Sequence, residues 1–149
     1  MYIKSTEGAE SPSELKDCTV RALANAALLP YEAAHKLLKR FGREDRRGCR
    51  ASTFHEAYEA ASLAFVGVYG TSLTAKFISH RYSLPLIKGL SLQSLLPTIS
   101  KGRYIVIVTG HAFAVVDGAI VDKGTNNSKK RIVALYKCKE NLLQLGYKA

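Results

Sequence analysis

The C-terminal third of the chain contains the stretch GHAFAVVDGAIVD, residues 110–122, which has the pattern of a β-hairpin. Apolar, strand-forming residues flank an Asp-Gly dipeptide at 117–118, a pair that favours the two-residue turns of hairpins. If this dipeptide forms the turn, Phe113 pairs with Asp122, and His111 lies diagonally from that aspartate on the same face of the sheet. A hydrogen bond between the two side chains is then within reach. A shift of one residue in register would put them on opposite faces.

The remainder of the chain predicts helices followed by strands. Apolar periodicity and turn residues place helices at residues 17–29, 31–41, 53–63 and 91–99, and strands at residues 64–69, 104–108, 111–116, 119–122 and 131–139. Residues 74–80 fit a helical turn or a strand equally well. Asp17 is expected to cap the first helix, and Thr53 to open a capping box with Glu56. This order predicts the α+β class, with N-terminal helices packed on a C-terminal antiparallel sheet.

The length and composition indicate one folded domain. A chain of 149 residues with 47% apolar and 23% charged residues can bury a core and does not resemble a disordered segment. We expect a single domain over residues 1–149, in which residues 1–16 form a leader that lies over the surface. No apolar run approaches the roughly 18 residues that span a membrane, and residues 1–7 lack the apolar core of a secretory signal. A cytoplasmic protein without membrane partners is expected.

The net charge of +10 is the main oddity of the composition. It is typical of proteins that bind nucleic acid or an acidic protein partner. The basic residues gather within residues 39–50 and 129–131, but no aromatic residues interleave with them to form a stacking platform. Zinc-finger and RNA-binding signatures are also missing from the sequence. We therefore favour a solvated basic surface over a dedicated nucleic-acid site.

The three cysteines, Cys18, Cys49 and Cys138, are an odd number without repeated spacing. This pattern argues against a disulfide framework, and the absence of a CxxC pair argues against zinc, so free thiols and no metal are expected. Cys49 follows a glycine in the basic loop, where no base on rigid structure is apparent, and Cys138 near the end of the last strand is expected to contribute to packing.

Cys18 is the cysteine with the best position for chemistry. It directly follows Asp17 at the start of a predicted helix, where the helix dipole and the free amides favour a thiolate. Its own amide is then available to hold a developing oxyanion, whereas the adjacent carboxylate opposes a second negative charge. With His111 as base and Asp122 as orienting acid, the chain holds the three parts of a cysteine hydrolase. Asp117 and Asn126 remain alternatives to Asp122 if the turn or the register differs, although the turn itself explains Asp117 better.

These stretches resemble the small papain-like cysteine peptidases, most closely the C39-like type of bacteriophage and bacterial genomes. The resemblance lies in the Asp-Cys helix start with Arg-Ala-Leu-Ala behind it (residues 17–24), followed by the Gly-His strand, the Asp-Gly hairpin and the second-strand aspartate. It implies a papain-like fold with Cys18 as nucleophile, His111 as general base and Asp122 as orienting residue. It also implies a protein or peptide substrate, no cofactor, and, for a phage-encoded protein, the host cytoplasm.

The chain departs from this family upstream of the cysteine. Such peptidases usually carry a glutamine there that completes the oxyanion hole, whereas residues 11–16 read SPSELK. Ser13, Lys16 or the backbone would have to substitute for it. Two main readings follow: a cysteine peptidase or isopeptidase, with a basic face that selects acidic substrates, or a catalytically degenerate papain-like module that binds a host protein. A basic nucleic-acid-binding protein is the less favoured third reading.

Overall fold

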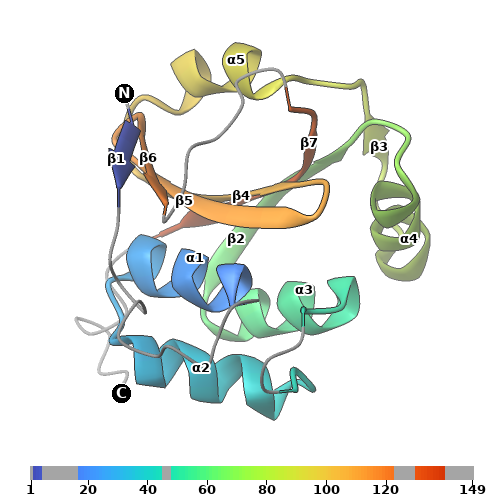
Figure 1. Ribbon diagram of the computed structural model, residues 1–149. Coiled ribbons are helices and arrows are strands. Elements are labelled where there is room, and N and C mark those ends of the chain that lie inside the picture. The colour runs from blue at the N-terminus through green and yellow to red at the C-terminus, as the bar shows by residue number, and fades with distance from the viewer. Residues whose placement is uncertain (1, 5–16, 45–47, 123–129, 140–149) are drawn as a thin grey trace.

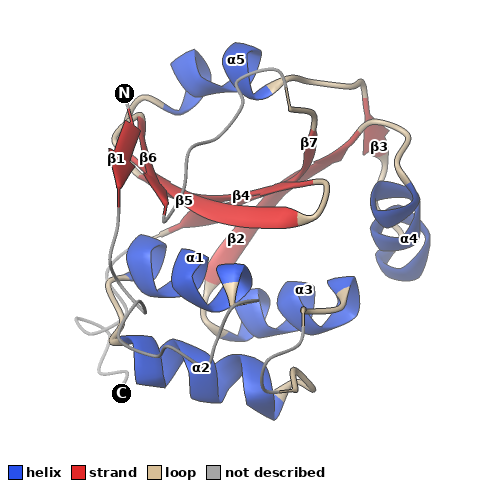
Figure 2. Cartoon of the chain, viewed as in Figure 1, coloured by secondary structure: helices blue, strands red, loops and turns tan. Residues whose placement is uncertain are grey.

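The computed structural model describes residues 2–4, 17–44, 48–122 and 130–139, which form helices on both faces of a seven-stranded sheet (Figures 1 and 2). In chain order the elements are β1 Tyr2–Lys4, α1 Cys18–Ala27, α2 Tyr31–Arg40, α3 Ala51–Ala60, β2 Leu63–Tyr69, α4 Leu73–Tyr82, β3 Leu86–Ile87, α5 Leu92–Leu95, the 3₁₀ helix η1 Leu96–Ile99, β4 Arg103–Val108, β5 His111–Val116, β6 Ala119–Asp122 and β7 Ile132–Cys138. The predicted α+β class is confirmed. Among the helices in these ranges, none has both the length and the apolar character that crossing a bilayer requires.

The sheet is mixed, which corrects the prediction of a purely antiparallel one. Its strand order is β1-β6-β5-β4-β7-β2-β3, and the five inner strands pair with one another in antiparallel orientation. The two edge strands pair in parallel, β1 with β6 and β3 with β2. Both are too short to leave an alternating pattern in the sequence, which is why they escaped the sequence analysis. Strand β1 comes from the segment expected to be a surface leader, and residues 5–16 of that segment lie outside the described residues.

The β5–β6 hairpin has the predicted register. Val116 pairs with Ala119, and the turn residues Asp117 and Gly118 have φ angles of 49° and 82°, as a type I′ turn requires at both central positions. The turn is also tied to the start of β4, because the Asp117 amide donates to the Gly102 carbonyl and the Gly102 amide donates to the Asp117 carboxylate, each at 2.8 Å. These bonds hold the register on which the position of His111 relative to Asp122 depends.

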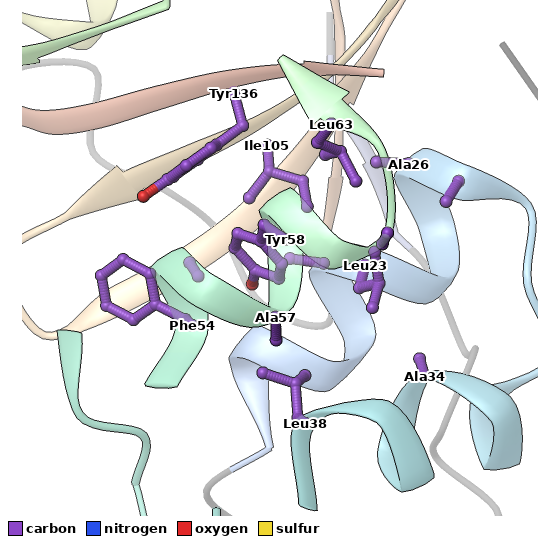
Figure 3. Close-up of a cluster of buried hydrophobic side chains, with 14 of the residues drawn as sticks. Leu23, Ala26, Ala34, Leu38, Phe54, Ala57, Tyr58, Leu63, Ile105 and Tyr136 are labelled. Carbon is purple, nitrogen blue, oxygen red and sulfur yellow. The ribbon is translucent and has the colours of Figure 1, made fainter. Parts of the chain in front are cut away.

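Helix α1 lies in the layer formed by α1, α2 and α3 below the sheet, and it packs against β5 and β4 (Figure 1). Its apolar side is fully buried at Val20, Leu23 and Ala27. Figure 3 shows Tyr58 of α3 and Tyr136 of β7 within this core. The Tyr58 hydroxyl donates a 2.8 Å hydrogen bond to the carbonyl of Thr19, in the first turn of α1. The start of α1 is therefore held both by apolar packing and by a buried polar contact.

The helix starts differ in detail from the predictions. Helix α3 begins at Ala51, so Thr53 lies inside the first turn and the predicted capping box does not form, because the extended residue before the helix is Arg50. Residues 73–82 settle into a helix, α4, whose cap Ser72 accepts a 3.1 Å bond from the Ala75 amide. The helix predicted at 91–99 is confirmed as α5 and η1, lying on the opposite face of the sheet from α1 (Figure 2).

Candidate active site

A cavity of about 400 Å³ opens where the start of α1 meets the turn between β4 and β5. Helix α1 contributes Cys18, the β4–β5 turn and the start of β5 contribute Gly110 and His111, and the segment that leads into α3 contributes Cys49. The apolar residues of the lining include Ala51, Phe54, Ile107, Val108 and Ala112. Three segments that are far apart in the sequence therefore bring two thiols and one imidazole to the same opening.

His111 and Asp122 form a direct side-chain pair. The Nε2 atom of His111 lies 2.7 Å from Oδ2 of Asp122, and the carboxylate is almost completely buried, with 4% of its side chain exposed. A carboxylate only accepts hydrogen bonds, so Nε2 donates and Nδ1 is the ring nitrogen left for Cys18. The carboxylate thus fixes the orientation of the imidazole in the way that the hairpin register predicted from the sequence.

The surroundings of His111 favour its protonated form. The pKa of His111 is raised from 6.5 to about 9, first by the hydrogen bond to Asp122 and next by a hydrogen bond to Cys18, while partial burial opposes the shift. At neutral pH the ring is therefore an imidazolium that lies against the Cys18 thiol. A positive charge in this position favours the thiolate, which is the nucleophilic form of a cysteine.

Asp17 does not have the role that the sequence predicted. It occupies the cap position of α1, but its carboxylate makes no cap hydrogen bond. Instead it forms a buried ion pair with Arg21 and accepts a 2.8 Å bond from the Tyr31 hydroxyl. Tyr31 could not be found from local sequence because it lies on the next helix, whereas the spacing of four residues between Asp17 and Arg21 is the signal that could have indicated their ion pair. The negative charge next to Cys18 is therefore paired with Arg21 and is not an isolated carboxylate, as the sequence analysis had treated it.

Cys49 is the site residue that the sequence analysis placed outside the site. It lines the same cavity as Cys18, and burial, the largest cause, raises its pKa to about 11. The sequence analysis began the third helix at Thr53, whereas α3 begins at Ala51. An earlier predicted start would have placed Cys49 two residues before a helix instead of within a loop. Cys49 is a neutral thiol at physiological pH. Cys138, at the end of β7, is buried away from the cavity lining, as expected for a packing residue.

The other sequence candidates lie elsewhere. Asp117 is bonded to Gly102 in the hairpin turn, at the end of β5 opposite to His111. Asn126, Ser13 and Lys16 lie outside the described residues, so their predicted roles stay predictions. Within the described part of the chain, no three His, Cys, Asp or Glu side chains gather in a group that could hold a metal ion.

The comparisons with known proteins found no relative. No family model matches the chain, and no curated protein or solved structure matches it either.

Proposed function

We propose that the protein is a cysteine-dependent peptidase or isopeptidase with a papain-like arrangement of helix and sheet. Cys18 is the nucleophile, His111 the general acid and base, and Asp122 the group that orients the imidazole. One observation carries the proposal: the first residue of α1 shares a cavity with an imidazole whose other nitrogen is bonded to a buried carboxylate.

Acylation is the first step of the proposed reaction. The Cys18 thiolate attacks the carbonyl carbon of the peptide or isopeptide bond and forms a tetrahedral adduct. The His111 imidazolium, protonated at neutral pH because its pKa is raised to about 9, gives its Nδ1 proton to the leaving amine. The carbon–nitrogen bond breaks, and the acyl group remains on Cys18 as a thioester.

Deacylation uses the same two residues. The neutral imidazole accepts a proton from water at Nδ1 while the water oxygen attacks the thioester carbon. The carbon–sulfur bond breaks, the acid product leaves, and the thiolate and imidazolium are restored. No cofactor takes part in either step.

The start of α1 supplies the proposed oxyanion donor. Amides in the first turn of a helix have no acceptor within the helix, and the helix dipole adds positive potential there. The Asp17 carboxylate caps none of them, because it is bonded to Arg21 and Tyr31. The Cys18 amide can thus donate to the oxyanion without a glutamine side chain, which the sequence lacks upstream of Cys18.

The test is the pH dependence of alkylation by iodoacetamide, read for each cysteine by peptide mass spectrometry. Wild type is compared with His111→Ala and with His80→Ala, a matched variant of an exposed histidine on α4. We expect Cys18 to react at pH 6, below the usual thiol pKa of about 8.5, and to lose this reactivity in His111→Ala alone. If Cys18 reacts no faster than Cys138 in all three proteins, the site is inactive, and the fold serves as a binding module instead.

A further inference from the structure

A second cavity, of about 590 Å³, lies next to the candidate active site at the same end of the sheet. It is lined by the end of β2 and the residues that follow it, the segment after β3, the β4–β5 turn and the start of β7. Thr109 of the turn lines this cavity, whereas its neighbours Val108 and Gly110 line the cavity that holds Cys18. One turn of the chain therefore borders both cavities.

The second cavity is basic. Lys88 and Arg131 belong to its lining, which contains no aspartate or glutamate, and Thr71, Ser72 and Thr109 add hydroxyl groups. In the part of the chain that the structure describes, no ion pair is recorded for either cation. Both side chains are exposed to solvent. The cavity thus offers two positive charges and several hydroxyls to a negatively charged group.

Gly89 lies beside Arg131 in this lining. A Cβ atom at position 89 would be 4.0 Å from a terminal nitrogen of the Arg131 guanidinium, which is an ordinary contact distance. A planar guanidinium with free space beside it can bind a carboxylate through two parallel hydrogen bonds.

We propose that this basic cavity binds an acidic side chain of the substrate, three or four residues from the scissile bond. The inference rests on the proposed peptidase function. The spacing follows from the sheet: β7 is two strands away from β5, which is roughly 10 Å at about 4.8 Å per strand. An extended peptide advances about 3.3 Å per residue, so it covers this distance in about three residues. The substrate class is therefore an extended peptide segment with a glutamate or aspartate at that spacing.

A protein substrate fits the cavity better than a nucleic acid does. Single-stranded nucleic acids bind along grooves in which bases stack on exposed aromatic rings. The aromatic residue of this lining, Tyr69, is only 8% exposed and leaves little ring surface for a base. The two cations of this lining can instead donate to the two oxygens of a single carboxylate.

The experiment uses fluorescein-labelled dodecapeptide pools in which one position at a time is fixed as Glu, Gln or Lys. Binding to the Cys18→Ala protein is measured by anisotropy, and cleavage by wild type is measured in parallel. Arg131→Gln and Lys88→Gln remove the proposed contacts. Lys101→Gln, an exposed lysine next to the start of β4 at the other end of the sheet, is the matched control for charge.

We expect the Glu pools to bind about fivefold more tightly than the Gln pools, and this preference to be lost in Arg131→Gln and Lys88→Gln but kept in Lys101→Gln. In wild type, the same fixed Glu should lie three or four residues from the cleaved bond. A missing preference, or one that all three variants reduce equally, would overturn the inference. So would tight binding of a single-stranded oligonucleotide through Arg131 and Lys88 without binding of Glu peptides. Glu-dependent binding without cleavage would leave the cavity assignment intact and contradict only the peptidase proposal.

Discussion

Two histidines of this protein lie in opposite environments. His55 of α3 is 2% exposed, its Nδ1 lies 2.7 Å from the Tyr136 hydroxyl, and the ring of Tyr82 stacks on it at 4.2 Å. His111 is half-buried at the end of the sheet, between the Asp122 carboxylate and the Cys18 thiol. Burial, the largest cause, lowers the pKa of His55 although Glu59 lies 3.1 Å from its Nε2, whereas Asp122 raises the pKa of His111 to about 9.

The difference shows what sets His111, the proposed general acid and base, apart from a buried structural histidine in this fold. Both rings have a hydrogen-bond partner and aromatic neighbours, so neither feature is diagnostic. The distinguishing combination is a buried carboxylate on one ring nitrogen and an opening with a nucleophile at the other. Only His111 has both among the partners that the structure describes. The following predictions test this contrast, from the largest expected effect to the smallest.

The first prediction exchanges each histidine for glutamine. His111→Gln should lower the rate of peptide cleavage by about 10²–10⁴-fold, because the proton donor and acceptor is lost. His55→Gln should leave the rate per folded molecule unchanged and lower the free energy of unfolding by about 1–3 kcal/mol, because a buried polar contact is broken. Steady-state kinetics and urea unfolding of both variants make the comparison. Equal losses of activity in the two folded variants would contradict it.

The second prediction concerns the Asp122 carboxylate, the negative charge that makes the environment of His111 differ from that of His55. Asp122→Asn should lower the pKa of His111 from about 9 and reduce the cleavage rate at pH 7 by about 10²-fold, since the imidazole loses both its orientation and its charge at that pH. NMR titration of the imidazole protons measures the pKa directly. The His55 resonances serve as an internal control and should not move. An unchanged His111 pKa would show that the carboxylate is not its main determinant.

The third prediction concerns stability against pH. The pKa of His111 is raised in the folded state, so its contribution to the free energy of unfolding is complete below pH 6.5. This contribution is lost as the pH rises to about 9. For a group partly open to solvent, we expect a loss of about 1–2 kcal/mol. His55 has a lowered pKa, so its contribution is present above pH 6.5 and is lost as the pH falls. The measurement is the Tm of thermal unfolding at each pH from 5 to 10. The fall in Tm on the alkaline side should be reduced in His111→Gln, and the fall on the acidic side should be reduced in His55→Gln.

The smallest effect is expected for Tyr136→Phe. This change removes the hydroxyl bonded to His55 but keeps the ring that packs edge-on against Tyr58 and Phe54. The free energy of unfolding should fall by about 1 kcal/mol, the usual net contribution of such a bond, and cleavage should be unaffected. Urea unfolding together with an activity assay checks both parts. A loss of activity in the folded variant would show that the His55 cluster is coupled to the site.

The parts of the site that could be predicted from the sequence depend on local chemistry. The Asp-Gly turn at 117–118 fixes the hairpin register, and the register brings His111 and Asp122 together. Apolar periodicity likewise identified α1, with Cys18 at its start. These inferences needed no knowledge of distant parts of the chain.

The features that escaped prediction depend on contacts between distant segments. The Asp17 carboxylate accepts a hydrogen bond from Tyr31 of the next helix and makes no cap bond to α1. Cys49 reaches the cavity because its loop packs beside α1, and β1 and β3 become strands only because β6 and β2 present free edges to them. The residue pattern within each of these short segments does not indicate which distant segment it will contact.

The two hydrogen bonds between Asp117 and Gly102 hold the β5–β6 hairpin in register, so His111 and Asp122 can be brought together by local structure alone. His111 and Asp122 are 11 residues apart on one hairpin, and hairpins form within about 1–10 μs. Cys18 lies on α1, far from this hairpin in the sequence, so its contact with His111 requires the closure of a much longer loop. A nascent or partly folded chain therefore carries a thiol without its imidazolium. If Cys18 is activated as proposed, its reactivity is expected to develop only when α1 docks beside His111, so the rate of alkylation would report this docking step during refolding.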